Sequence, residues 1–258
     1  MTLESHIRSR LKEKKILLMT HIVIGYPNLE ASLEIVRTMV EAGVDLMELQ
    51  IPFSEPIADG PVILKANQEA LAGGVTVERC LEFGRTVARQ FPIPFLYMTY
   101  YNILFKYGVD RFAAHMHEVG VKGAIVPDLP PEEAGDYLEA MDRHGRRPIF
   151  IFSPTTTPAR MQAIAKVAGG FVYCVARKGV TGDRTEFSRQ IDDYLARCRQ
   201  ATPLPLALGF GVKDKSDIKF LEGKADIAVM GTQALRLMKE HGIAALGDYI
   251  RDLQGETA

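Results

Sequence analysis

Short apolar runs alternate with longer amphipathic segments along the whole chain, and this alternation constrains the fold more than any other feature. The runs are rich in Ile, Val, Leu or Phe and are bounded by Gly, Pro or Asp. There are eight of them: 16–24, 45–51, 94–98, 123–126, 148–152, 171–175, 204–208 and 226–230. Short continuous apolar runs are typical of buried parallel strands.

The segments between these runs have helical periodicity. In 29–43, the residues Leu33, Val36 and Val40 lie three or four positions apart, and Gly43 is placed to end the helix. The segment 188–200 has the same spacing. Eight strand–helix alternations predict an α/β protein of the (β/α)8 TIM barrel class, with an open doubly wound sheet as the alternative. Because no Ser/Gly-rich linker divides the chain, we expect one domain over residues 1–258.

Composition excludes several functional classes. The chain has 31 Lys and Arg against 32 Asp and Glu, so it has no general attraction for nucleic acid or for an anionic membrane. No apolar run approaches the ~20 residues that cross a bilayer. Cys80, Cys174 and Cys198 are too widely spaced for a CxxC metal site, and their odd number argues against a disulfide framework. We therefore expect a cytoplasmic protein, and the spacing of its His and acidic residues predicts no metal site.

Two of the connections are longer than the rest. Measured from the start of one run to the start of the next, the second unit extends from Asp45 to Pro94 and the sixth from Phe171 to Leu204. Unusually long connections tend to be functional, and in a barrel the loops that leave the carboxyl ends of the strands form the active site. We therefore expect the active site at loops two and six. The Gly-rich and charged sixth loop is either a lid or simply a solvated loop.

The second run places a carboxyl group inside the predicted barrel. Side chains alternate along a strand, so Leu46, Glu48 and Gln50 are expected to face inward. A buried carboxyl group near the end of a barrel strand suits an acid and base catalyst, although a core Arg or Lys that neutralises Glu48 is an alternative. Asp59, on the loop that follows, is either a turn residue or a second functional carboxylate.

Small residues follow the seventh and eighth runs. They are Gly209, Phe210 and Gly211 in one place, and Gly231 and Thr232 in the other. Glycines at these two loops of a barrel are typical of a phosphate site, where main-chain N–H groups bind the anion, although simple turns have the same composition. Tyr100 and Tyr173 either line a pocket or fill the core, and periodicity by itself favours the core.

The segment 47–61, which runs from Met47 to Pro61, resembles the signature of the alpha subunit of tryptophan synthase. Further matches to that family lie at 73–76, 98–102, 126–130, 153–155, 179–182 and 209–211, and the resemblance covers about residues 16 to 240. It implies a lyase of tryptophan biosynthesis that cleaves indole-3-glycerol phosphate to indole and glyceraldehyde 3-phosphate by a retro-aldol reaction. It also implies no cofactor in this chain and an αββα heterotetramer with a beta subunit that carries PLP.

The resemblance also implies roles for individual residues. Glu48 matches the acid and base carboxylate, and Asp59 matches the carboxylate that holds the indole N–H. The remaining matches are expected to bind substrate: Tyr173, Phe210 and Tyr100 at the aromatic pocket, and Gly182, Gly211, Gly231 and Thr232 at the phosphate.

Four positions depart from the family pattern. Gln50 replaces a Gly, His21 replaces a Phe, Tyr26 replaces the Asp of a Gly-Asp-Pro sequence, and Glu55 replaces an Asp. Because Gln50 shares the inward face with Glu48, we expect its bulk to intrude on the pocket. These departures leave two alternatives: a weakly active alpha-like subunit that binds and activates a beta subunit, and a different sugar-phosphate lyase or isomerase.

Overall fold

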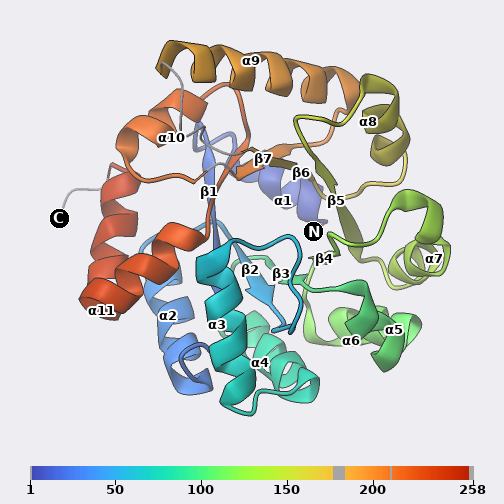
Figure 1. Ribbon diagram of the computed structural model, residues 1–258, viewed down its shortest axis with the longest axis vertical. Coiled ribbons are helices and arrows are strands. Elements are labelled where there is room, and N and C mark those ends of the chain that lie inside the picture. The colour runs from blue at the N-terminus through green and yellow to red at the C-terminus, as the bar shows by residue number, and fades with distance from the viewer. Residues whose placement is uncertain (1, 177–183, 210, 256–258) are drawn as a thin grey trace.

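The computed structural model of the chain describes residues 2–176, 184–209 and 211–255. Eight parallel strands pair in chain order and close into a barrel, with β1 hydrogen-bonded to β8, and the helices surround it (Figure 1). The predicted (β/α)8 class is confirmed, and closure excludes the open sheet. The strands are β1 (Leu17–Val23), β2 (Leu46–Gln50), β3 (Phe95–Met98), β4 (Gly123–Ile125), β5 (Arg147–Phe152), β6 (Val172–Val175), β7 (Leu206–Gly209) and β8 (Ile227–Met230).

Most helices lie on the outside of the barrel. They are α2 (Leu29–Glu41), α3 (Pro61–Ala72), α4 (Val77–Gln90), α5 (Tyr101–Tyr107), α6 (Val109–Val119), α7 (Gly135–Arg143), α8 (Pro158–Ala165), α9 (Arg184–Ala201), α10 (Lys215–Leu221) and α11 (Thr232–Leu253). Local chemistry sets several of their ends. Asn28 caps α2 by accepting the N–H of Ala31, and Gly43 follows that helix at a φ of +91°.

The long connection after β2 is mostly helical. It contains α3 and α4, so only residues 51–60 form an extended loop, which we call loop 2. In the connection after β6, residues 177–183 lie outside the described part of the chain, and the candidate lid falls there. The connection after β2 is therefore long because it contains two helices instead of one.

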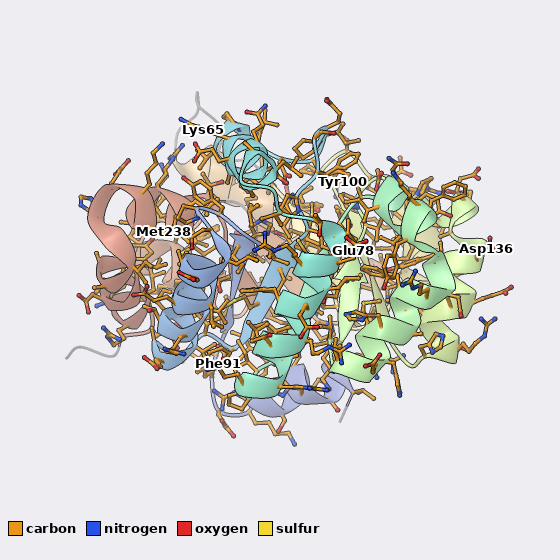
Figure 2. The ribbon with its side chains drawn as sticks, turned by 90° about the horizontal axis from the view of Figure 1, so that it is seen from below. Lys65, Glu78, Phe91, Tyr100, Asp136 and Met238 are labelled. Carbon is orange, nitrogen blue, oxygen red and sulfur yellow. The ribbon has the colours of Figure 1, made fainter. Side chains whose placement is uncertain are left out.

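The amino-terminal end of the barrel is closed by α1 (Leu3–Arg10), which lies behind the barrel in Figure 1. Its Leu3 and Ile7 pack into the interior cluster that includes Leu17 and Phe171. Figure 2 shows α1 near Phe91 at one end of the molecule, and Tyr100 towards the other end. This arrangement leaves the carboxyl ends of the strands as the open end of the barrel, where barrel enzymes carry out their chemistry.

The two faces of β2 behave as the alternation predicts. Leu46 packs in the interior cluster, whereas Met47, Leu49 and Ile51 belong to the cluster between the strands and the outer helices. In the parallel pairing of β1 with β2, His21 is opposite Glu48 and Val23 is opposite Gln50. The register therefore sets the inward-facing His21 side by side with Glu48.

Candidate active site

Glu48 is a buried carboxyl group with one oxygen unsatisfied. Its side chain is 3% exposed, and its Oε2 atom lies 2.9 Å from Nδ1 of His21. Its Oε1 atom is buried and has no hydrogen-bond partner within the described residues. An unpaired buried polar atom costs free energy, so such an atom calls for an explanation. Oε1 is therefore open to a group that the described residues do not supply.

Two of the departures from the family pattern, His21 and Gln50, lie together beside this carboxyl group. The ring of His21 has its second nitrogen, Nε2, 2.9 Å from Oε1 of Gln50. The amide of Gln50 then donates from Nε2 to Oδ2 of Asp59 over 2.6 Å. We call this continuous set, Glu48–His21–Gln50–Asp59, the carboxylate bridge. It joins β2, β1 and loop 2, and it connects both predicted catalytic carboxylates.

Asp59 is held in place from its other side by Tyr100. The hydroxyl group of Tyr100 donates to Oδ2 of Asp59 over 3.3 Å and accepts the N–H of Ala58 over 3.2 Å. The ring of Tyr100 stacks on Phe53 with centroids 5.0 Å apart. Tyr100, which periodicity assigned to the core, therefore fixes loop 2 over the open end of the barrel.

Electrostatics in the site follow from burial and from this bridge. Burial raises the pKa of Asp59, although His21 and the hydrogen bonds from Gln50 and Tyr100 oppose the rise. Burial by itself lowers the pKa of His21, but the hydrogen bond to Glu48 and the charges of Glu48 and Asp59 outweigh it. The net pKa of His21 is raised, which favours its protonated form.

Tyr173 belongs to the same site. Burial raises the pKa of Tyr173 well above its ordinary value, and the charges of Glu48 and Asp59 raise it further because both carboxyl groups are near. A side chain at Gly209 would place its Cβ only 3.0 Å from the Tyr173 hydroxyl oxygen. Glycine at the end of β7 thus gives the ring of Tyr173 its space.

The predicted phosphate end lies next to this bridge. Gly231 precedes Thr232, the first residue of α11, and a Cβ built at Gly231 would lie 3.5 Å from Cβ of His21. Gly211, after β7, has a φ of +87° and open space around it. The start of α11 therefore borders the side chain that contacts Glu48. Gly182 and Phe210, the other two predicted substrate-binding residues, lie outside the described residues.

Sequence reasoning treated His21 and Gln50 only as departures and missed that they contact each other. The alternation along β2 placed Gln50 on the same face as Glu48, but contact with His21 depends on the register of β1 against β2. Within the described part of the chain, no helix has the length and hydropathy to cross a membrane.

Comparison with known proteins agrees with this architecture. The family model described as tryptophan synthase alpha chain matches residues 7–251. A tryptophan synthase alpha chain of Syntrophotalea carbinolica is 66% identical over 252 residues, which cover 98% of this chain and 100% of the relative. A relative from Desulforapulum autotrophicum with the same name is 62% identical and covers 97% and 99%.

Solved structures give the same result. Tryptophan synthase of Mycobacterium tuberculosis superposes with a TM-score of 0.91 at 31% identity, covering 98% of this chain and 97% of that one. Tryptophan synthase subunit alpha of Legionella pneumophila superposes with a TM-score of 0.88 at 30% identity, covering 99% and 98%. Sequence and structure thus lead to one conclusion: the chain belongs to the tryptophan synthase alpha chain family.

Proposed function

We propose that this chain cleaves indole-3-glycerol phosphate to indole and glyceraldehyde 3-phosphate, with Glu48 as the acid and base. The observation that carries this proposal is the Oε1 atom of Glu48 at the open end of the barrel, which is buried and has no hydrogen-bond partner among residues 2–176, 184–209 and 211–255. A carboxyl group in this position can give a proton to the indole ring carbon that bears the side chain. It can then take the proton of the glycerol hydroxyl group as the carbon–carbon bond breaks.

This sequence of steps balances without any other reagent. The hydroxyl proton replaces the proton that Glu48 gave to the ring, and the electron pair of the broken bond returns to the protonated indole ring. Because the ring itself accepts these electrons, the reaction needs no cofactor in this chain. Acid and base assistance contributes about 10²–10⁴-fold, so orientation and charge complementarity supply the rest.

Asp59 has the second role in this proposal. Its carboxylate accepts the indole N–H and stabilises the positive charge that develops on the ring when the carbon is protonated. Gln50 and Tyr100 both donate to its Oδ2 atom, so the position of the carboxylate is set before substrate binds. Tyr173, near both carboxyl groups, is placed to line the pocket for the ring.

The phosphate group is assigned to the turns after β7 and β8. The first N–H groups of α11 have no partners within the helix, and with Gly211, Gly231 and Thr232 they suit an anion. The short separation between Gly231 and His21 supports this assignment, because one small molecule must contact both the phosphate turn and Glu48. Gly182 and Phe210 remain predicted contacts.

Single-turnover cleavage of indole-3-glycerol phosphate by the purified chain, with and without a beta subunit, tests the function. We expect cleavage in both cases, and a fall of about 10²-fold or more in Glu48→Gln at an unchanged melting temperature. No cleavage by the wild-type chain with a beta subunit present would contradict the proposal and leave the non-catalytic activator. Near-normal turnover in Glu48→Gln would refute the role of Glu48.

We also propose that the chain assembles with two beta subunits and a second alpha chain as αββα, with PLP bound only by the beta subunits. Two large apolar side chains lie beside the site and are exposed: Ile57 of loop 2 by 80% and Phe105 of α5 by 72%. Tyr100 links them, because it binds the backbone at Ala58 and directly precedes α5. A beta subunit that covers this face would bury both residues and order loop 2.

Sedimentation of the mixed subunits tests the assembly. We expect a mass equal to two copies of each chain, and weaker assembly in Ile57→Asp and Phe105→Asp. Lys65→Asp, on the exposed surface of α3, is the control, and a loss of assembly as large as in the other variants would contradict the assigned face. We further place the chain in the cytoplasm, because its three cysteines are buried and form no disulfide.

A further inference from the structure

We propose that His21 and Gln50 are positioning residues that tie Glu48 to Asp59, and that His21 works as an imidazolium that keeps the transferable proton of Glu48 on its free oxygen. This inference rests on the proposed function. It concerns two of the residues in which this chain departs from the family pattern.

Hydrogen-bond directions along the carboxylate bridge follow from its two ends. The carboxylate of Asp59 only accepts, so the NH₂ group of Gln50 faces it and the amide oxygen faces His21. Nε2 of His21 must then carry a hydrogen and donate it to Gln50. The remaining question is whether Nδ1, 2.9 Å from Oε2 of Glu48, also carries a hydrogen.

The chemistry answers this question. If Nδ1 were bare, it would accept the proton of Glu48 on Oε2, and Oε1 would have no proton to give to the substrate. If Nδ1 carries a hydrogen, it donates to Oε2, and the proton of Glu48 resides on Oε1, the buried oxygen for which the described part of the chain offers no partner. Every donor in the bridge then meets an acceptor, and only the group that faces the substrate stays open.

The imidazolium also acts while the proton moves. When Oε1 gives its proton to the ring carbon, the carboxylate that remains is paired with a positive charge 2.9 Å away. Oε1 then takes the hydroxyl proton and Glu48 is neutral again. His21 keeps both of its N–H protons throughout, so the pair ends the reaction with the same number of protons that it had at the start.

The surroundings of His21 favour this charge. Burial opposes the charge, but the hydrogen bond to Glu48 of β2, the charges of Glu48 and of Asp59 on loop 2, and the hydrogen bond that His21 donates to Gln50 raise its pKa. The charge of Glu48 contributes while that carboxyl group has given up its proton, and the other contributions act throughout. Tyr173 of β6 and Tyr100 have raised pKa values and stay neutral. The neighbouring strand β8, Ile227–Met230, carries no titratable residue.

A double-mutant cycle tests the bridge. His21→Phe and Gln50→Gly each restore the family residue at one position but leave the other member unpaired. We expect each single variant to lower kcat by about tenfold to a hundredfold with little change in KM, since both residues are proposed to act through Glu48 and Asp59. The double variant removes both unpaired groups, so we expect it to lose no more than the worse single variant.

Two spectroscopic and kinetic measurements separate charge from mere packing. In the wild-type chain, NMR of the ring nitrogens should show both protonated at pH 7, and kcat should fall at high pH as His21 loses its proton. His21→Phe should lack this basic limb. His115→Phe is the control, because that half-buried histidine contacts the Leu81 carbonyl on the outer helices and should leave kcat and its pH profile unchanged.

The results that would overturn the inference are equally definite. Additive losses of kcat in the double-mutant cycle would show that His21 and Gln50 do not act together. An unprotonated Nδ1 at pH 7 would show that His21 is not an imidazolium. The NMR measurement uses the wild-type protein and so decides the second point even if a variant does not fold. Failure of the wild-type chain to cleave substrate would instead contradict the proposed function.

Discussion

Removing one oxygen atom, in Tyr100→Phe, gives a quantitative test of how loop 2 is positioned. The ring stays stacked on Phe53, so the change isolates two hydrogen bonds of the hydroxyl group. A net hydrogen bond between neutral groups contributes about 0.5–1.5 kcal/mol and one to a charged group about 1.5–3 kcal/mol. The contacts here are long, at 3.2 and 3.3 Å, so the lower values apply to both.

The predicted magnitudes follow from these values. We expect the free energy of unfolding to fall by about 1–2 kcal/mol. We expect kcat/KM to fall about tenfold, since a contribution of about 1.4 kcal/mol to holding Asp59 corresponds to one factor of ten. The hydroxyl group also lowers the pKa of Asp59. Without it that pKa rises, and because Asp59 acts as a carboxylate, the acid limb of kcat/KM moves to higher pH.

The assay is kcat/KM for indole-3-glycerol phosphate across pH, together with thermal unfolding. Tyr137→Phe is the matched control, because the Tyr137 hydroxyl donates to the Ala124 carbonyl over 3.2 Å between α7 and β4, away from the site. It should lose stability to a similar extent and keep its activity. A Tyr100→Phe variant within twofold of wild-type kcat/KM, with its acid limb unmoved, would refute this account of loop 2.

Three further predictions concern stability and pH. Asp45→Asn should lower the free energy of unfolding by about 2–4 kcal/mol without changing kcat, because Asp45 binds Arg10, Lys14 and the N–H of Leu18 at the closed end of the barrel. Chemical denaturation measures the first quantity and turnover the second. A large fall in kcat would contradict the view that the closed end is independent of the active site. Gly84→Ala should lower the melting temperature, since its Cβ would overlap the hydroxyl group of buried Tyr97 and overpacking costs about 1–3 kcal/mol; an unchanged melting temperature would show that Tyr97 moves freely. Because the pKa of His21 is raised in the folded state, its protonation stabilises the fold fully below the ordinary histidine pKa of 6.5, and this contribution is lost as pH rises through the folded-state pKa. The stability advantage of wild type over His21→Phe should therefore shrink above pH 6.5. A difference that stays constant with pH would contradict a charged His21.

The same structure changes the expectation for Gln50. From its bulk, removal of the side chain in Gln50→Gly should open the pocket and raise activity. From its hydrogen bonds to His21 and Asp59, removal should lower activity. Turnover of this single variant decides between the two, and the carboxylate bridge favours the loss.

The eight apolar runs and the alternation along β2 are local patterns, and local patterns determined much of this protein. Each run became a strand, and Glu48 faces the interior as its place between Met47 and Leu49 predicts. The signature segment 47–61 was sufficient to indicate the family. These features depend on residues close in the chain, whose periodicity directly reflects which face is buried.

The tertiary structure alone decided how distant residues meet. His21 and Glu48 are brought together by strand register, and Tyr100 reaches Asp59 because loop 2 folds back over the barrel. Gly231 borders His21 only because β8 closes on β1. Such contacts join residues far apart in the chain, and no periodicity records them. They form when the closing barrel fixes the stagger of every strand. That stagger brings His21 and Gln50, two of the departures from the family pattern, into one hydrogen-bonded bridge.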